Sequence, residues 1–243
     1  MEIFRLKEWP ENGAERQAYL DPVFATIASK YDFMTRVLSF GQEQRWKRKA
    51  VGRIPRDGPL IRMLDLATGT GDFPVHLHGA GLGAQIVALD RNPTMLAFAA
   101  RKCARHPQIR FIQGDLMHIP FKDHLFDAIT MGYGLRYVAD ILQTLREVFR
   151  LLRSGGMFVC LDFGLPKSDF YRRVCSGYLL LSGTLWGLLL HGKRDTYWHI
   201  VESLKAYPGQ EAVAQWMKGV GFDQIEAEEE LGGIAVIISG VRP

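Results

Sequence analysis

The sequence predicts an α/β fold built on a doubly wound parallel sheet that ends in an antiparallel hairpin. Between residues 60 and 163, short apolar runs alternate with stretches of helical periodicity. Strands and helices that alternate in this way form parallel sheets with right-handed crossovers. The composition agrees, because 47% apolar and 23% charged residues are ordinary proportions for a globular protein. The chain of 243 residues is also long enough for a sizeable core.

The elements of this sheet follow from the apolar runs and from the turns between them. Helical spacing of apolar residues indicates three connecting helices, and Asn92 is the expected N-cap of the second. Ser154, Gly155 and Gly156 are expected to stop the third. We expect strands at residues 60–66, 85–90, 109–113, 126–131 and 157–163, and helices at 73–79, 93–105 and 138–152.

Further elements are expected on both sides of this core. Residues 16–52 have helical periodicity, and residues 166–207 form a mostly helical, very apolar segment. A helix at 209–220 precedes strands at 223–231 and 234–241, which the Gly232-Gly233 link joins as a hairpin. We expect one domain in four parts: a helical cap (1–58), a ligand-binding core (59–165), an apolar helical insertion or lid (166–207), and a C-terminal helix and hairpin (208–243).

Charge is distributed unevenly along the chain. The net charge of +4 is too small a surplus to indicate nucleic-acid binding. Bases are concentrated in residues 41–56 and acids in residues 223–230. A basic segment of this kind is either a solvated face or a contact with an anionic membrane surface.

Cysteine usage and the N-terminal sequence favour a cytoplasmic protein. The three cysteines have the spacing of neither a disulfide framework nor a zinc site, and no apolar run of signal-peptide length begins the chain. The uncharged run 174–190 is shorter than the roughly 20 residues that span a membrane, so we expect it to be buried or interfacial. Its glycines, Gly177, Gly183 and Gly187, favour a mobile lid over a rigid helix.

A glycine-rich loop follows the first expected strand. Gly69 and Gly71 allow a ligand to approach the backbone closely, although a plain tight turn gives the same pattern. Pro74 stands where a dinucleotide-binding G-x-G-x-x-G motif has its third glycine. Asp65 and Asp72 would repel a pyrophosphate. The loop therefore favours a ligand with a cationic aminoacyl end, and a dinucleotide-dependent oxidoreductase is the rival.

Carboxylates also end the second and third expected strands. Asp90 can accept hydrogen bonds from both hydroxyls of a ribose. Asp115 can accept one from an adenine amino group while Leu116 packs on the ring. Each aspartate alone could be a loop or cap residue. Together, three such strand ends at one sheet edge predict a ligand that contains adenosine.

These motifs resemble those of a known family. The chain resembles the core of class I S-adenosylmethionine (SAM) methyltransferases in the runs MLDLATGTGD, ALDRNPTML, GDLMHIPF, FDAIT and LRSGGMFV. This resemblance implies a seven-stranded Rossmann-like sheet. Similarity to the UbiE-type C-methyltransferases of ubiquinone and menaquinone biosynthesis lies in SKYDFMTRVLSFGQEQRWKR, GLRYVAD, YPGQEAVAQWMKGVGF and LGGIAVIISG. The resemblance covers about residues 20–240.

The resemblance implies SAM as the cofactor. Carried over by position, the family's cofactor contacts are Thr70, Asp90 and the pair Asp115-Leu116. We expect the full set of cofactor-binding residues to be Asp65, Thr68, Gly69, Thr70, Gly71, Asp90, Arg91, Met95, Asp115, Leu116 and Gly132.

Four residues are candidates for catalysis: Arg136, Tyr31, Tyr197 and His199. Arg136 lies just beyond the fourth strand, in the stretch Gly-Leu-Arg that resembles the family's most distinctive motif. Because arginine stays protonated, its expected role is to stabilise a developing anion rather than to act as a base. Three of these residues also have a purely structural interpretation. Arg136 could be a surface or ion-pairing arginine, Tyr31 an ordinary half-buried aromatic residue, and His199 a partly exposed helix residue.

The chain departs from the family pattern in three places. Gly132 stands where Ser or Asn is common, Tyr137 stands where Asn is usual, and residues 175–194 are unusually rich in leucine. His76 and His78 point to different faces of their expected helix, and the histidines form no metal set. We expect no metal.

The reaction implied is SAM-dependent C-methylation of a polyprenylated quinol ring, in demethylmenaquinol or the related ubiquinone precursor. The alternatives are methylation of another lipophilic phenol or secondary metabolite, and a non-catalytic SAM-binding subunit of a quinone-biosynthesis complex. The expected partner is the quinol, with no nucleic acid. Peripheral contact with the inner face of the membrane and a homodimer are compatible with the sequence.

Overall fold

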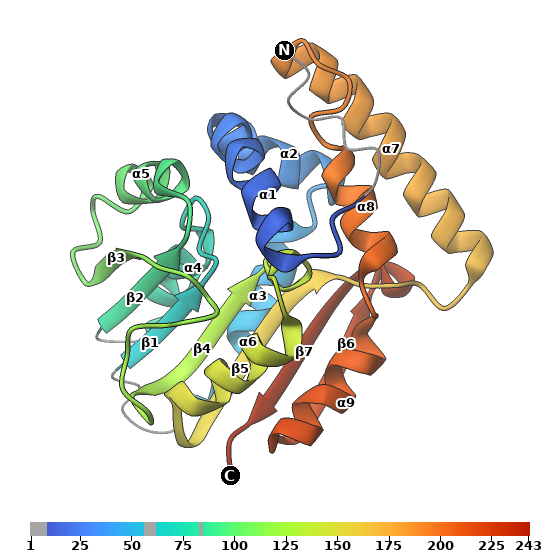
Figure 1. The fold of residues 1–243 in the computed structure, drawn as a ribbon. Helices are drawn as coiled ribbons and strands as arrows, with labels where there is room; N and C mark the ends of the chain where they lie inside the picture. The colour runs from blue at the N-terminus through green and yellow to red at the C-terminus, as the bar shows by residue number, and fades with distance from the viewer. Residues whose placement is uncertain (1–8, 56–61, 83–84) are drawn as a thin grey trace.

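A computed structural model describes residues 9–55, 62–82 and 85–243. Its strands are β1 (Arg62–Leu66), β2 (Gln85–Asp90), β3 (Ile109–Gln113), β4 (Phe126–Gly132), β5 (Leu152–Phe163), β6 (Asp223–Glu230) and β7 (Ala235–Val241). Within these residues the seven strands form one sheet in the order β3-β2-β1-β4-β5-β7-β6 (Figure 1). Strand β7 runs antiparallel to its neighbours β5 and β6, and the other pairs are parallel. The predicted doubly wound sheet with its C-terminal hairpin is confirmed.

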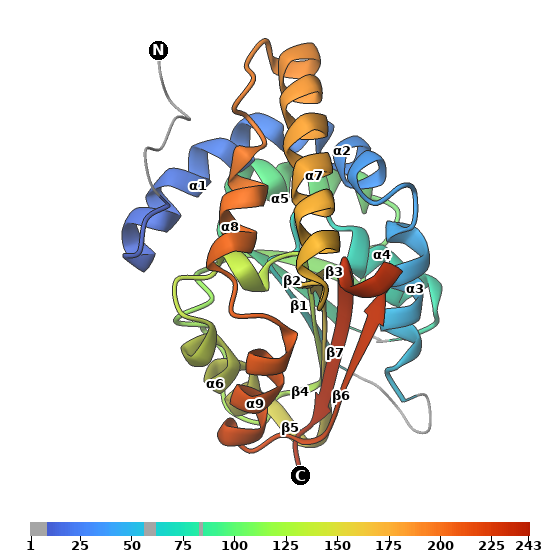
Figure 2. The same ribbon diagram turned by 90° about the vertical axis from the view of Figure 1, so that its right-hand side faces the viewer.

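Two layers of helices cover the sheet (Figure 2). On one face, α3 (Glu43–Gly52), α4 (Asp72–Gly79) and α5 (Pro93–Lys102) enclose a core that includes Trp46, Leu77 and Ile86. On the other face, α6 (Ile141–Leu151) and α9 (Gln210–Val220) contribute residues such as Leu145 and Met217. These layers leave the carboxyl ends of the parallel strands for the loops and the cap.

Some predicted boundaries are wrong. Strand β5 begins at Leu152 rather than at residue 157, because Leu152 pairs with Phe126 and the predicted stop at 154–156 is an irregularity within the strand. Helix α6 begins at Ile141 rather than at residue 138, because residues 135–137 form a separate 3-10 turn. The hairpin link is longer than predicted, because Leu231 joins the two glycines in a 3-10 turn. Residues 60 and 61 of the first predicted strand lie outside the described residues.

Four helices gather over the carboxyl ends of the parallel strands (Figures 1 and 2). They are α1 (Gly13–Ile27), α2 (Tyr31–Leu38), α7 (Asp169–His191) and α8 (Trp198–Ala206). Each contributes to one apolar cluster, which includes Ile27, Met34, Leu179 and Ile200. The segment expected to be helical, residues 16–52, is helical over most of its length and is divided among α1, α2 and α3. A 3-10 turn at 28–30 and a bend at 39–42 separate them.

The basic and acidic segments of the sequence pair with each other. Lys49 of α3 forms ion pairs with Glu228 and Glu230 of β6, and Arg53 contacts Glu228 at 2.7 Å. These charges lie along β6, a strand at the edge of the sheet. Charged side chains on an edge strand oppose its pairing with a strand of another molecule. Lys49 and Arg53 therefore have partners within the chain.

Helix α7 is continuous and has one buried and one exposed face. A Cβ at the buried Gly187 would lie 2.6 Å from the carbonyl oxygen of Lys193, and one at Gly183 would lie 3.0 Å from the Cβ of Tyr197. These two glycines therefore allow close packing of the following chain. On the outer face, Leu181 and Leu189 are 72% and 63% exposed, so the run is buried on one face only. By length and composition alone, α7 could cross a membrane.

Candidate active site

A cleft of about 740 Å³ opens where the loops after β1, β2, β3 and β4 meet helix α1. The predicted cofactor-binding residues that line it are Gly69, Asp90, Arg91, Met95, Asp115, Leu116 and Gly132. The other predicted residues do not line it: Asp65 lies in β1, and Thr68, Thr70 and Gly71 lie in the loop that follows.

The loop after β1 turns sharply beside this cleft. Ala67, Gly69 and Gly71 all have positive φ angles, which glycine adopts without strain. A Cβ at Gly71 would lie 3.1 Å from the Cβ of Ala99, whereas the nearest atoms to one at Gly69 would be 4.0 Å away. Gly71 therefore serves the packing of the loop on α5, and Gly69 is the glycine that borders a ligand.

Asp90 holds the two loops that end β1 and β2. Its Oδ2 accepts the N–H of Gly69 at 2.7 Å, and its Oδ1 accepts the N–H of Asn92 at 2.8 Å. A carboxylate has about four acceptor positions, so both oxygens keep capacity for ligand hydroxyls in the cleft. Burial raises the pKa of Asp90, although these N–H groups oppose the rise.

Asp115 is tied to helix α1 through an arginine. Its Oδ2 pairs with Nη1 of Arg91 at 3.1 Å, and Nε of Arg91 pairs with Asp21 at 3.0 Å. The N–H of Met117 donates to the other oxygen of Asp115. Arg91 therefore connects the cap to the wall of the cleft.

The two acids of the glycine loop do not face a ligand. Asp72 pairs with Lys47 and Lys102, and although burial favours its neutral form, these cations hold its pKa well below the usual range. Asp65 accepts a hydrogen bond from Oγ1 of Thr130 at 2.6 Å, and burial raises its pKa to about 7. The expected attraction of Asp72 for a cationic ligand is therefore wrong, because the protein already neutralises it.

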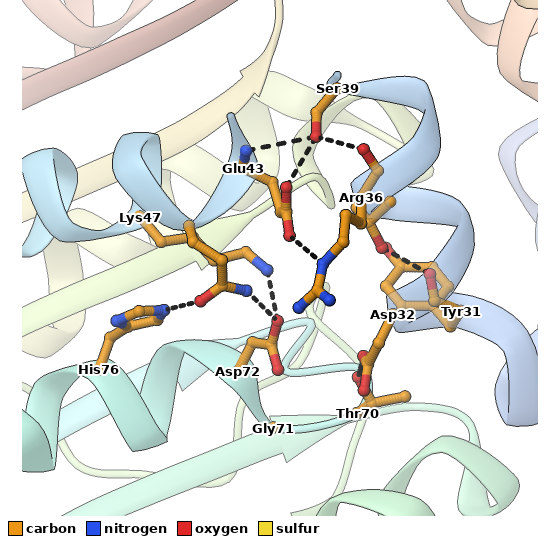
Figure 3. Close-up of polar contacts among 12 residues, drawn as sticks. Tyr31, Asp32, Arg36, Ser39, Glu43, Lys47, Thr70, Gly71, Asp72 and His76 are labelled. Carbon is orange, nitrogen blue, oxygen red and sulfur yellow. Dashed lines mark hydrogen bonds and ion pairs between the residues drawn. The ribbon is translucent and has the colours of Figure 1, made fainter. Parts of the chain in front are cut away.

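A polar network pins helix α2 to the glycine loop (Figure 3). Thr70 donates from Oγ1 to Asp32 of α2 at 2.5 Å, and Lys102 pairs with Asp32 at 2.6 Å and with Asp72 at 2.5 Å. The neighbour of Asp32 is Tyr31, whose ring lines the cleft. Thr70 therefore acts on the site by fixing α2, and through it Tyr31.

A second cavity, of about 420 Å³, adjoins the cleft beneath the cap. All four residues predicted for catalysis line it: Tyr31, Arg136, Tyr197 and His199. The residues that line both spaces are Phe24, Tyr31, Tyr133 and Tyr137. We call this second cavity the chamber. Since the two spaces share these four aromatic residues, a ligand in the cleft and a planar ring in the chamber would lie side by side.

Arg136 is buried at the base of the chamber. It forms an ion pair with Asp162, donates from Nε to Ser203 at 3.1 Å, and donates from Nη2 to the hydroxyl of Tyr137 at 2.9 Å. Its guanidinium lies 4.4 Å from the ring centroid of Tyr137 and 4.8 Å from that of Phe163. The guanidinium is therefore paired and held in one position at the edge of the chamber.

His199 is a neutral acceptor in the same chamber. Its Nδ1 lies 3.1 Å from the carbonyl oxygen of Thr196, which can only accept, so Nδ1 carries the proton. Burial lowers the pKa of His199 to about 3, so the ring is uncharged at neutral pH. Its Nε2 therefore presents a lone pair. The nearby Tyr197 hydroxyl is within 3.0 Å of Nε2 of His191.

The departures from the family pattern have structural counterparts. A side chain at Gly132 would collide with the ring of Phe73, so the glycine makes room for that ring. Tyr133 has a φ of 57°, a conformation that is strained in a bulky residue and is often found at functional sites. Tyr137 contributes the hydroxyl that accepts from Arg136.

Sequence reasoning missed the contribution of helix α1 and of two tyrosines. Gln17, Asp21 and Phe24 of α1 line the cleft, and Tyr133 and Tyr137 line both spaces. The departure at Tyr137 was the available signal for that residue. No local pattern marks α1, because its approach to the sheet edge depends on contacts far apart in the sequence. Among the described residues, no group of three or more His, Cys, Asp or Glu side chains could hold a metal ion.

Known proteins resemble the chain over nearly its whole length. Residues 12–242 match the ubiE/COQ5 methyltransferase family. A demethylmenaquinone methyltransferase of Thermus thermophilus is 39% identical over 91% of this chain and 100% of its own. A ubiquinone/menaquinone biosynthesis C-methyltransferase UbiE of Proteus mirabilis is 32% identical over 94% of this chain and 92% of its own.

Solved structures share the fold. A SAM-dependent methyltransferase of Thermotoga maritima matches 92% of this chain and 99% of its own with a TM-score of 0.64 at 17% identity. A SAM-dependent methyltransferase of Aquifex aeolicus matches 81% and 89% with a TM-score of 0.57 at 15% identity. At these identities the likeness establishes the architecture alone.

Proposed function

The chain belongs to the ubiE/COQ5 methyltransferase family, and on that premise we propose that it transfers a methyl group from SAM to a ring carbon of demethylmenaquinol, a polyprenylated naphthoquinol. The Thermus thermophilus relative carries the name of this activity, and SAM is the methyl donor of the structural neighbours. The observation that carries the proposal is the aromatic-walled chamber beside the cleft, which holds all four residues expected to act on the ring.

The residues of the cleft fit SAM. Asp90 has spare acceptor positions for the two ribose hydroxyls, and Asp115 can accept from the adenine amino group. Leu116 and Met95 supply apolar surface for the adenine ring, and Gly69 leaves the backbone accessible. When bound, SAM supplies a methyl group activated by its positively charged sulfur.

The chamber orients the quinol ring. Its apolar and aromatic lining includes Phe24, Met34, Leu38 and Ile200. Such a lining favours a flat, uncharged ring, and it excludes water that would compete for hydrogen bonds. Holding the reacting carbon beside the cleft provides the positioning that accelerates a two-substrate reaction.

Arg136 and Tyr137 stabilise the charge that develops on the ring. Arginine only donates, so the Tyr137 hydroxyl accepts from Nη2 and must direct its own proton elsewhere. That proton is available to a ring oxygen. When the quinol hydroxyl gives up its proton to a water molecule at the mouth of the chamber, the new oxyanion receives this hydrogen bond, and the guanidinium of Arg136 lies behind the tyrosine.

His199 accepts a hydrogen bond from the quinol ring, whereas Tyr137 donates one to it. Its Nε2 lone pair accepts a hydrogen bond from a ring hydroxyl and so fixes the orientation of the ring. With a pKa lowered to about 3, His199 holds a proton poorly and acts as an acceptor rather than as a store of protons.

The exposed face of α7 is the surface by which this cytoplasmic enzyme reaches a membrane-dissolved substrate. Phe170, Leu181, Leu185 and Leu189 are exposed along it. Basic side chains stand near both ends of α7: Arg173, Lys193 and Arg194. Apolar contact combined with bases near anionic lipids is the usual basis of peripheral binding.

Transfer of a labelled methyl group tests the proposal. Purified protein, SAM labelled in the methyl group and chemically reduced demethylmenaquinone should give labelled menaquinone. The reduced ubiquinone precursor and a simple lipophilic phenol serve as competing acceptors. Preference for either competitor would contradict the naphthoquinol assignment, and SAM binding without transfer to any acceptor would indicate a non-catalytic subunit.

Quinone analysis in a deletion strain supplies the matching observation in the cell. Loss of the gene should lead to accumulation of the demethylated naphthoquinone, with its tail intact, in extracted lipids. An unchanged quinone profile would contradict the proposal.

A further inference from the structure

A third cavity, of about 450 Å³, lies where the first turns of α7 face the end of α8 and the chain after β5. We call it the α7–α8 groove. Apolar side chains make up most of its lining: Phe163, Leu165, Pro166, Leu179, Leu204 and Ile234. Cys175 and Ser176 of α7 complete the wall on one side. The groove lies beyond the cleft and the chamber, and the reaction as described above does not use it.

The groove and the chamber share one lining residue, the aromatic Phe163. Its ring centroid lies 4.8 Å from the guanidinium carbon of Arg136. Helix α8 also borders both spaces, because it contributes Ile200 to the chamber and Leu204 to the groove. Four residues along a helix correspond to about 6 Å. The two cavities are therefore successive spaces along the same helix.

The charges at the groove are already paired, which decides the kind of ligand. Arg172 donates from Nη2 to the carbonyl oxygen of Pro166 at 3.0 Å and lies 3.4 Å from Asp169. Lys205 pairs with Glu202 at 2.7 Å. An anionic ligand would have to displace these partners, whereas a hydrocarbon needs only the apolar lining. The groove therefore suits a neutral chain better than a fatty acid or a phosphate.

We propose that the α7–α8 groove binds the polyprenyl tail of the quinol while its ring occupies the chamber. This inference rests on the proposed function, because it assigns the tail of the same substrate. The tail passes Phe163 and lies along α8. It then leaves beside the first turns of α7, where Phe170 and Val174 are 75% and 50% exposed. The path ends on the face of α7 that contacts the membrane, so the tail can remain partly in lipid.

A variant that fills the groove tests this path. Ser176→Phe places a ring among the lining residues, and Ser182→Phe is the matched control on the same helix, because Ser182 lines none of the three cavities. Each protein is assayed in detergent with a long-tailed demethylmenaquinol and with its tail-less analogue. Ser176→Phe should raise KM for the tailed quinol at least tenfold more than for the tail-less one. Ser182→Phe should change both values in parallel.

The outcomes separate this inference from the proposed function. Equal effects of Ser176→Phe on both substrates would overturn the groove assignment while leaving the methyltransferase activity in place. If the wild-type protein methylates neither quinol, the proposed function fails, and the binding measurement below still decides whether a prenyl chain occupies the groove.

Alkylation of Cys175 provides that binding measurement on the wild-type protein. Cys175 lines the groove and is partly exposed, whereas Cys103 and Cys160 are buried. Mass spectrometry follows alkylation of Cys175 with N-ethylmaleimide in the presence of menaquinones with increasing tail length. The rate should fall at least fivefold once the tail reaches the groove, and the tail-less quinone should not protect. Equal rates with and without a tail would overturn the proposal, even if Ser176→Phe did not fold.

Discussion

At the scale of single residues, Arg136 has two roles: it pairs with the buried Asp162, and it stabilises the reacting ring in the proposed reaction. Different substitutions can separate these roles. Arg136→Ala leaves Asp162 buried without its counter-charge, and breaking such a pair costs about 3–5 kcal/mol of stability. Arg136→Lys keeps a cation near Asp162 but cannot reproduce the planar fork that also reaches Ser203 and Tyr137. We expect Arg136→Lys to fold, to bind SAM within about twofold of wild type, and to lower kcat by roughly a hundredfold.

Calorimetry with SAM, thermal unfolding and methyl-transfer rates measure these three properties. Wild-type turnover by Arg136→Lys would show that Arg136 serves the fold alone. Equal losses of SAM affinity and turnover would show that it supports the cleft rather than the reacting ring.

Tyr137 is the residue that delivers the charge of Arg136 to the substrate. Tyr137→Phe removes one hydroxyl and should lower kcat by roughly a hundredfold while KM changes little, because the hydrogen bond strengthens as the oxyanion forms. Tyr207→Phe is the control, since the Tyr207 hydroxyl is also buried but lines none of the three cavities. Stopped-flow or single-turnover rates on the quinol measure both. Similar rates in the two variants would remove Tyr137 from the mechanism.

Asp90 makes a quantitative prediction about the cofactor. Asp90→Ala removes a charged acceptor that also holds the backbone at Gly69 and Asn92, and loss of such hydrogen bonds costs about 1.5–3 kcal/mol each. The affinity for SAM should fall at least tenfold, as calorimetry would measure. Circular dichroism should show that the fold is retained. Unchanged affinity would remove Asp90 from the cofactor site.

At the scale of secondary-structure elements, local pattern predicted what local sequence controls. Strands β2 and β3 were predicted to the residue, and Asn92 caps α5 through the N–H groups of Thr94 and Met95. Contacts between distant segments were not predictable in this way. The ion pair of Arg136 with Asp162 and the contact of α3 with β6 join residues whose spacing along the chain carries no signal. The chamber was foreseen as a set of residues, but its shape depends on how the cap packs.

Helix α7 makes a prediction about membranes. The double variant Leu181→Gln/Leu189→Gln removes two of its most exposed leucines, and burial of each leucine in lipid contributes about 1.5–3 kcal/mol. Binding to vesicles that contain anionic lipid should fall at least tenfold in a sedimentation assay. Trp216→Gln, on the exposed surface of α9, is the control and should bind as wild type does. Equal binding of all three proteins would contradict the assignment of α7 as the membrane-facing surface.

At the scale of the whole molecule, the cap is joined to the core by charged contacts around the cofactor cleft. Asp32 reaches from α2 to Lys102 of α5, and Asp21 reaches from α1 to Arg91. Thr70 joins the glycine loop to the same network. Because these contacts surround the cleft, the cap and the core together form the site, and neither part holds a complete one.

Two buried groups with opposite pKa shifts shape the pH dependence of stability. Burial lowers the pKa of His199 from about 6.5 to about 3, so between these values the unfolded chain binds the extra proton and stability falls as pH falls. Burial raises the pKa of Asp65 from 3.8 to about 7, so between these values the folded protein binds the extra proton and stability falls as pH rises. From about pH 4.5 to 6 the two contributions have opposite signs and largely cancel.

Substituting either residue should therefore expose the contribution of the other to the pH dependence of stability. Each proton bound differently by the two states changes the free energy of unfolding by about 1.4 kcal/mol per pH unit. Relative to wild type, His199→Gln should lose stability as pH rises from 4.5 to 6, because it no longer has the histidine contribution that grows with pH. Asp65→Asn keeps an acceptor for Thr130 and should gain stability relative to wild type over the same range. Urea unfolding of the three proteins at several pH values measures both slopes, and other titrating groups cancel in the differences. Curves for both variants that run parallel to the wild type would show that neither group is shifted by its burial, and the neutral His199 assigned to the chamber would then be wrong.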